Sequence, residues 1–155
     1  MKKKFILIGI ISFLLDQIIK YIVEAKLTVI NVIPNFLKLI YTKNEGVAFS
    51  IFNGKRIFII IVSIVIIYML FKMLSKDYFI KKNTKLIEDI TYGILFGGVF
   101  GNLFDRIVRG YVVDYISLNI FGYNFPVFNL ADIFITVSVI FIIIFTLKED
   151  KNKIV

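Results

Sequence analysis

The chain contains no cysteine and no histidine among its 155 residues. Without cysteine it can form neither a disulfide bond nor a thiolate nucleophile, and it has no residue to which a lipoprotein's lipid could be attached. Without histidine it lacks a serine–histidine pair, and the absence of both residues removes the usual zinc ligands. We therefore expect no metal and no cofactor. Any catalysis depends on carboxylate, hydroxyl or lysine side chains.

Apolar residues are present in excess. They make up 59% of the chain, 17 residues are phenylalanine, and the mean hydropathy is +0.87. A soluble domain of this length could not bury so much apolar surface, so we predict a single membrane domain covering residues 1–155. The net charge of +8 could suggest a nucleic-acid partner, but the lysines lie between and outside the apolar runs instead of on one face. We expect no nucleic acid.

Four apolar runs predict an α-helical membrane protein with four transmembrane helices, at about residues 5–23, 57–74, 86–104 and 130–147. The first run follows a basic start, as in a secretory signal, but no small-residue cleavage site follows it. Its apolar character also resumes after Asp16 and Gln17. We therefore expect an uncleaved helix, since about 20 residues at 1.5 Å per residue cross a hydrocarbon layer of about 30 Å.

The segments between the first and second runs and between the third and fourth runs, residues 24–56 and 105–129, lack a helical run of membrane length. The first is rich in β-forming residues and contains turn sequences at Pro34-Asn35 and Asn44–Gly46, which predicts a small β-sheet on the membrane surface. Lysines concentrate at both ends of the chain and between the second and third runs. The positive-inside rule then predicts a multi-pass membrane protein with both termini cytoplasmic and both segments outside.

Asp16 and Lys20 are spaced i, i+4 in the first predicted helix, with the acid on the N-terminal side. This spacing favours a helical ion pair. We expect a structural pair near the outer interface, with the Lys20 side chain extending towards water. Direct catalysis is the less favoured interpretation, because a carboxylate paired with a cation is a poor proton donor.

The third predicted helix carries a glycine every fourth residue, at Gly93, Gly97 and Gly101. Such a stripe lets a neighbouring helix approach closely, either within the chain or in a dimer, and packing is favoured over ligand contact. Polar residues cluster where this run ends, at Asn102, Asp105 and Arg106. They could cap the helix and anchor it at the interface, or they could orient a nearby carboxylate.

Two carboxylates beside the apolar runs, Asp114 and Asp132, are the strongest catalytic candidates, because a charge close to hydrocarbon is costly to retain. Asp132 could instead complement the dipole of the last helix, in whose first turn it lies. The predicted topology places both at the outer face. Two acids about 3 Å apart do not both ionise, so one can take a proton from water while the other polarises a peptide carbonyl. The helix dipole suggests that Asp114 holds the shared proton, but the pair titrates as a unit and the assignment stays open.

Five sequence blocks carry a family resemblance. They are DQIIKY (Asp16–Tyr21), KNEGVAFS (Lys43–Ser50), GGVFGNLFDR (Gly97–Arg106), GYVVDY (Gly110–Tyr115) and FNLAD (Phe128–Asp132). In this order and with this four-helix layout, they resemble the lipoprotein signal peptidases, also called signal peptidase II. The resemblance implies an aspartic endopeptidase of the bacterial inner membrane. Such an enzyme acts at the outer leaflet on prolipoproteins, cleaves before a diacylglyceryl-modified cysteine and contacts membrane lipid. We expect the chain to work as a monomer.

The resemblance also assigns roles to individual positions. Asp114 and Asp132 match the catalytic pair, and Asp16 and Lys20 match a structural pair. Further positions are expected to shape the site or hold the substrate backbone: Asn44, Gly46, Asn102, Asp105, Arg106, Asn129 and Ala131. Val47 departs from the family pattern, which usually has a small alanine there, and it adds bulk beside Gly46.

Two other functions are compatible with parts of the sequence. A small transporter or channel subunit could use Asp16, Lys20 and Asp132 as a polar relay and the glycine stripe as an oligomer interface. It predicts acids at several depths, whereas the best candidates here are expected at one face. Intramembrane aspartyl proteases that cut within transmembrane helices have more spans and a Gly-x-Gly-Asp block, which this sequence lacks.

Overall fold

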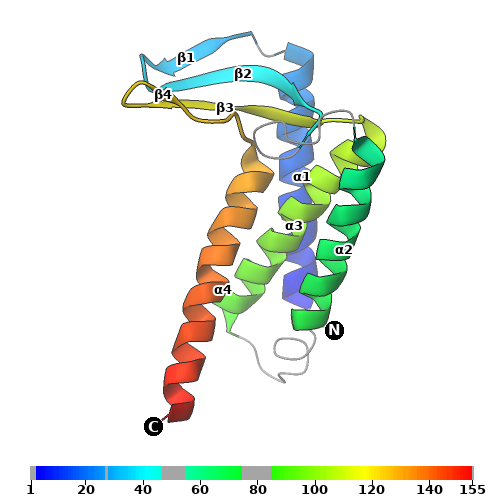
Figure 1. Ribbon diagram of the computed structural model, residues 1–155, viewed down its shortest axis with the longest axis vertical. Coiled ribbons are helices and arrows are strands. Elements are labelled where there is room, and N and C mark those ends of the chain that lie inside the picture. The colour runs from blue at the N-terminus through cyan, green and yellow to red at the C-terminus, as the bar shows by residue number, and fades with distance from the viewer. Residues whose placement is uncertain (1–2, 27, 47–54, 75–84, 155) are drawn as a thin grey trace.

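The computed structural model describes residues 3–26, 28–46, 55–74 and 85–154. Its elements in chain order are α1 (Lys3–Lys26), β1 (Ile30–Ile33), β2 (Leu37–Asn44), α2 (Arg56–Leu74), α3 (Leu86–Val108), β3 (Val112–Ile120), β4 (Tyr123–Asn124) and α4 (Leu130–Ile154). The helices form a bundle, the sheet lies across one end of it, and the chain termini lie towards the opposite end (Figure 1).

The four predicted helices are present, but α1, α3 and α4 are longer than expected, and the extension of α3 affects the site. α3 continues to Val108, so Asp105 and Arg106 are helical residues and do not belong to the external segment in which we had placed them. The helix ends where Gly110 adopts a φ of +90° and the N–H groups of Arg109 and Gly110 both donate to the Asp105 carbonyl oxygen, at 2.8 and 3.1 Å. We had placed the end of α3 where its apolar run stops, whereas the helix actually ends at the backbone reversal at Gly110.

Among the described residues, two helices have the length and apolar composition of a membrane span: α1, and residues Leu130–Lys148 of α4. The most apolar stretches of these helices are only 22% and 11% buried within the protein. A core helix of a soluble protein would be mostly buried, so these side chains face outward in the manner of lipid-exposed helices.

The predicted sheet is confirmed, and both non-helical segments contribute to it. It is antiparallel, in the order β1-β2-β3-β4. Strands β3 and β4 are joined by a two-residue turn in which Phe121 and Gly122 have φ values of 51° and 86°, as a tight hairpin requires. Strand β3 is buried from Val112 to Tyr115 and becomes exposed towards Ile120. Its first half therefore lies against the helices.

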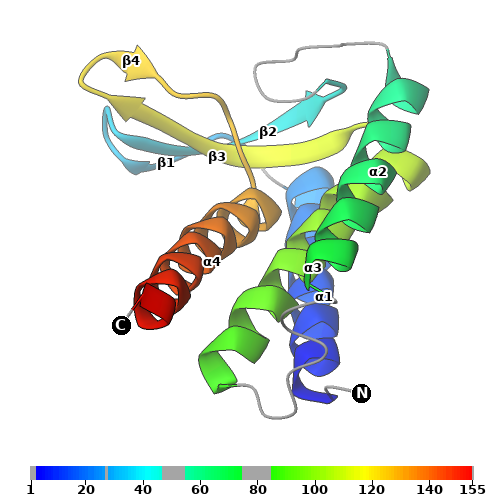
Figure 2. The ribbon, with the colours of Figure 1, turned by 60° about the horizontal axis from the view of Figure 1, so that its bottom comes forward.

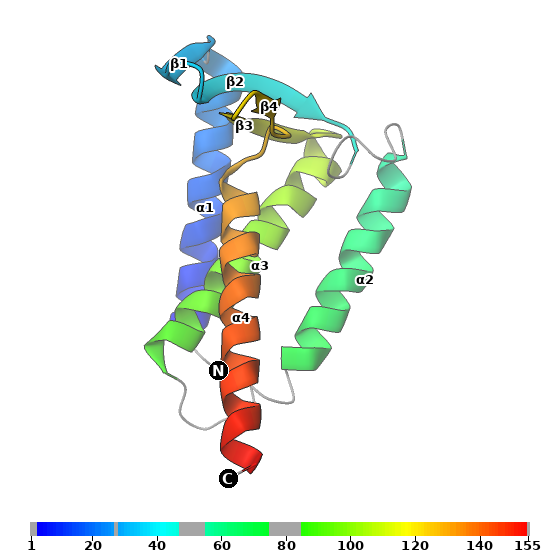
Figure 3. The ribbon, with the colours of Figure 1, turned by 60° about the vertical axis from the view of Figure 1, so that its left-hand side comes forward.

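Helix α3 is central, with α4 on one side and α2 on the other (Figure 2) and α1 packed along it (Figure 3). The glycine stripe faces α1. A Cβ atom added at Gly97 would lie 2.6 Å from the Cβ of Ser12, and one added at Gly101 would lie 2.5 Å from Oδ2 of Asp16. The stripe therefore serves helix packing within the chain, one of the two interpretations that the sequence left open.

Candidate active site

Asp114 lies on the buried half of β3 and is 3% exposed. Its Oδ2 accepts a hydrogen bond from Nδ2 of Asn44 at 2.8 Å, and its Oδ1 accepts one from Nδ2 of Asn129 at 2.6 Å. The pKa of the Asp114 carboxyl group is raised to about 6, chiefly by burial and to a smaller extent by the nearby Asp132 charge, while the two amide donors oppose the rise. This carboxyl group therefore retains its proton to a higher pH than an ordinary aspartic acid does.

Asp132 lies in the first turn of α4, where it forms a reciprocal cap with Asn129. Its N–H donates to Oδ1 of Asn129 at 3.1 Å, and its Oδ2 accepts from the N–H of Asn129 at 3.1 Å. Asp132 therefore has a structural role at the start of α4, as a cap and not only through the helix dipole that the sequence suggested. Its other oxygen, Oδ1, accepts from Nδ2 of Asn102 at 2.8 Å and faces α3. A single carboxylate thus caps α4 and also contacts α3.

Two amide side chains connect the carboxylates. Nδ2 of Asn129 donates to Oδ1 of Asp114 and also contacts Oδ1 of Asn102 at 3.2 Å, while Nδ2 of Asn102 donates to Asp132. Asn129 is 0% exposed and Asn102 is 8% exposed. The structure therefore brings the two aspartates, 18 positions apart in sequence, into one buried polar centre between β3, α3 and α4.

Arg106 holds the Asn44–Gly46 turn against α3. Its Nη2 donates to the carbonyl oxygen of Gly46 and its Nη1 to that of Asn102, both at 3.2 Å, and the N–H of Gly46 donates to Oδ1 of Asn44 at 3.0 Å. The buried Nε of Arg106 has no hydrogen-bond partner among the described residues. Of the predicted motif positions, Asn44, Asn102 and Asn129 contact the carboxylates directly, and Arg106 and Gly46 join this network through hydrogen bonds. Val47, whose bulk we expected to affect this turn, lies outside the described residues.

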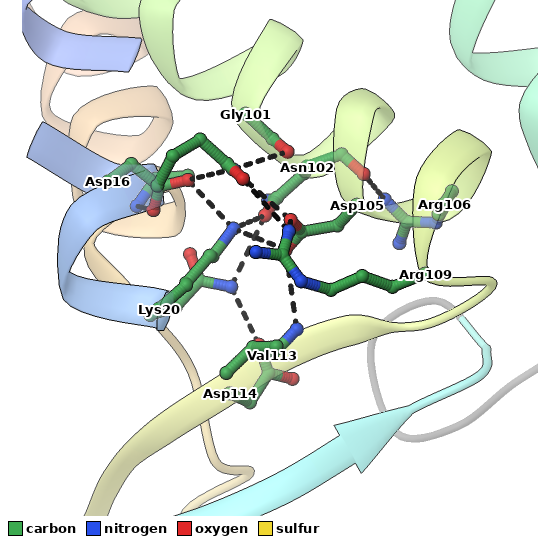
Figure 4. Close-up of polar contacts among 12 residues, drawn as sticks. Asp16, Lys20, Gly101, Asn102, Asp105, Arg106, Arg109, Val113 and Asp114 are labelled. Atoms are coloured by element: carbon green, nitrogen blue, oxygen red, sulfur yellow. Dashed lines mark hydrogen bonds and ion pairs between the residues drawn. The ribbon is translucent and has the colours of Figure 1, made fainter. Parts of the chain in front are cut away.

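The expectation for Lys20 was wrong in one respect: its side chain is 0% exposed and does not extend to water. Nζ of Lys20 lies 2.8 Å from Oδ2 of Asp16 and 2.8 Å from Oδ2 of Asp105, and it donates to Oδ1 of Asn102 at 2.8 Å (Figure 4). The glycine at position 101 allows α1 to approach α3 closely enough for these contacts. The sequence predicted the i, i+4 pair but not the third charged member from another helix.

Sequence reasoning missed three residues beside this centre: Gln17, Arg109 and Tyr115. Nε2 of Gln17 and Nη1 of Arg109 both donate to Oδ1 of Asp105. The i, i+4 spacing of Asp105 and Arg109 was the signal that could have found the second contact. The hydroxyl oxygen of Tyr115 accepts from the N–H of Leu130 at 3.2 Å, and burial raises its pKa to about 12, so it stays neutral and fixes the start of α4.

Comparison with known proteins gives the context for this centre. Residues 8–148 match the family described as signal peptidase (SPase) II. Proteins of Staphylococcus aureus strains JH9 and Newman, both called lipoprotein signal peptidase, are 40% identical over 151 residues, which cover 96% of this chain and 90% of each relative. Two solved structures of bacterial membrane enzymes, at 2.3 and 1.9 Å resolution, match with TM-scores of 0.84 and 0.80 at 38% identity. The first match covers 99% of this chain and 93% of the other, and the second covers 96% and 95%. The chain therefore belongs to the signal peptidase II family of membrane proteases.

Proposed function

We propose that this protein is an aspartic endopeptidase that removes signal peptides from prolipoproteins by cleaving before a diacylglyceryl-modified cysteine. The observation that carries the proposal is the meeting of Asp114 and Asp132 in one buried polar centre of a chain that belongs to a peptidase family. These two residues are the only members of the centre to which we assign proton transfer.

In the proposed reaction, ionised Asp132 takes a proton from a water molecule, and the resulting hydroxide attacks the scissile carbonyl carbon. Protonated Asp114 polarises the carbonyl oxygen and transfers its proton to it, giving a neutral tetrahedral intermediate. The C–N bond then breaks, the amide nitrogen receives the proton held by Asp132, and the hydroxyl proton returns to Asp114. The raised pKa of Asp114 supports its assignment as the initial acid.

The remaining motif residues bind or orient. The amides of Asn44, Asn102 and Asn129 hold carboxylate oxygens by hydrogen bonds of 2.6–2.8 Å. In this proposal the substrate backbone is held by the turn at Gly46 and by Arg106, whose Nε has no partner within the described part of the chain. Asp105 and Ala131 hold the surrounding elements in position. Asp105 does so through its ion pair with Lys20, and Ala131 through the hydrogen bond that its N–H donates to Asp16.

We also propose that all four helices of a single domain cross the bacterial cytoplasmic membrane, with both termini in the cytoplasm and the carboxylates at the outer leaflet. The position of the sheet and the polar centre at one end of the bundle, with the chain ends towards the other, supports this orientation (Figure 1). The lysine-rich residues 75–84, on which the sidedness partly rests, lie outside the described residues. The internal packing of the glycine stripe supports a monomer.

An apolar groove supports the proposed contact with lipid. It has a volume of about 870 Å³ and lies between α1, α2 and α3, with Phe5, Phe71 and Ile107 among the residues lining it. It does not open between the two aspartates. We assign it to acyl chains because its lining is almost wholly apolar, and we assign the polar centre to the peptide.

The proposal is tested with purified protein in liposomes, given a diacylated prolipoprotein peptide and the same peptide without lipid. We expect cleavage of the diacylated peptide alone, before the modified cysteine. Cleavage of both peptides would refute the lipid requirement. Cleavage of neither would refute the peptidase assignment and favour the transporter alternative.

A further inference from the structure

The charged cluster formed by Asp16, Lys20 and Asp105 lies beneath the two catalytic candidates, and all three side chains are 0% exposed. Burying charged groups costs several kcal/mol per ion unless they are paired and hydrogen-bonded, and replacing such a cluster with apolar side chains is often neutral or stabilising. Stability alone is therefore a weak reason for its presence. Its hydrogen bonds to the polar centre suggest a second role.

Each acid of the cluster holds the backbone of a residue that precedes a catalytic candidate. Oδ1 of Asp16 accepts from the N–H of Ala131 at 3.1 Å, immediately before Asp132 in the chain. Oδ2 of Asp105 accepts from the N–H of Val113 at 3.3 Å, immediately before Asp114. The two acids therefore anchor the two elements, α4 and β3, that carry the reacting groups.

Lys20 connects these anchors. Its Nζ lies 2.8 Å from a carboxylate oxygen of Asp16 and 2.8 Å from one of Asp105, as Figure 4 shows, so it draws both acids towards one point. The same ammonium group donates to Oδ1 of Asn102 at 2.8 Å. Because an ammonium group can only donate, the oxygen of the Asn102 amide must face Lys20, and its NH₂ group is left to face Asp132.

We propose that Lys20 is a positioning residue for the reaction, which sets the spacing of Asp114 and Asp132 through Asp16, Asp105 and Asn102. Its role is not limited to pairing α1 with α3. The inference rests on the proposed function, because it requires that the two aspartates react. Misplacing reacting groups by about 1 Å can cost about 100-fold in rate. Loss of Lys20 therefore lowers kcat by at least tenfold, and it leaves KM nearly unchanged because Lys20 is too deeply buried to contact substrate.

The experiment uses the full chain in liposomes and the diacylated peptide. Lys20→Met alone leaves Asp16 without its cation, so the deciding variant is Asp16→Asn with Lys20→Met, which removes one charge of each sign and keeps an oxygen for the N–H of Ala131. The matched control is Glu24→Gln. Glu24 lies on the same helix and pairs with Arg109 at 3.2 Å, so its loss weakens the junction of α1 with α3 without touching Asn102.

The readouts are the unfolding midpoint, kcat and KM, with kinetics measured below the midpoint of every variant. We expect the double variant to lose at least tenfold in kcat with KM within about twofold of wild type, and Glu24→Gln to keep the wild-type kcat. A wild-type kcat in the folded double variant would overturn the inference, as would an equal fall in the control.

If neither Lys20 variant folds, Asn102→Leu tests the inference instead. It removes the amide group that joins Lys20 to Asp132 and leaves both ion pairs of Lys20 in place. A wild-type kcat in that variant would also overturn the inference. Failure of the proposed function is recognised separately, by turnover in Asp132→Asn.

Discussion

Replacing Gly101 with alanine sets two effects of opposite sign against each other. In a helix interior, alanine is favoured over glycine by about 1 kcal/mol. At this position, however, the new Cβ would lie 2.5 Å from Oδ2 and 3.2 Å from Cγ of Asp16. The Asp16 side chain is fully buried, and its carboxylate is held by Lys20, Gln17 and the N–H of Ala131.

The clash outweighs the gain in helix propensity. An ordinary contact needs about 3.4 Å, so the carboxylate would have to retreat by about 0.9 Å from its 2.5 Å position. That movement stretches the hydrogen bond of 3.1 Å from the N–H of Ala131 and the ion pair of 2.8 Å with Lys20. Leaving buried polar groups without partners costs about 1–3 kcal/mol each, and overpacking costs a similar amount. We expect Gly101→Ala to lower the free energy of unfolding by about 2–4 kcal/mol.

The assay is unfolding in mixed micelles titrated with sodium dodecyl sulfate, followed by circular dichroism and by residual peptidase activity. Gly9→Ala is the matched control, since it is also a helical glycine on the α1–α3 contact. Its added Cβ would meet only the carbonyl oxygen of Gly93, at 3.3 Å, so a change within about 1 kcal/mol is expected. If Gly101→Ala were as stable as Gly9→Ala, the close approach of Asp16 would not be the reason for glycine at position 101.

Four further outcomes are expected. Asp114→Asn and Asp132→Asn should each abolish turnover while insertion and substrate binding persist, because an amide keeps the size of the carboxyl group but cannot transfer a proton. Turnover in either variant would remove that aspartate from the proposed catalytic pair. Because burial raises the pKa of Asp114 to about 6, kcat/KM should fall as the pH rises through about 6 and the proposed acid loses its proton. Asn44→Ala removes a hydrogen bond that favours the ionised form, so this limb of the pH profile should move to higher pH; an unmoved limb would contradict the assignment. The chain has no tryptophan, and Phe121 is fully exposed at the tip of the sheet, so Phe121→Trp introduces a single fluorescent reporter there. If the sheet lies on the membrane surface, brominated lipids should quench this fluorescence. Unquenched emission at the wavelength of tryptophan in water would place the sheet away from the bilayer.

The helices and their class could be predicted from the sequence because membrane-length apolar runs have few alternative structures. The absence of histidine and cysteine directed attention to carboxylates, and Asp114 and Asp132 were singled out because acids beside apolar runs are costly. The turn at Pro34-Asn35 could be predicted because proline and asparagine are common turn residues, and Asn35 adopts a φ of 59°. All of these features depend on local sequence, which explains why the sequence sufficed.

Only the tertiary structure decided what the polar residues contact. The end of α3 depended on the backbone reversal at Gly110, so the helical position of Asp105 could not be predicted from hydropathy. The burial of Lys20 depended on a helix that begins more than sixty positions later, because its contacts with Asn102 and Asp105 exist only where the glycine stripe lets α1 and α3 approach. Apolar periodicity records which residues avoid water, whereas hydrogen bonds between distant segments depend on how the helices pack, and no local pattern in the chain encodes that geometry.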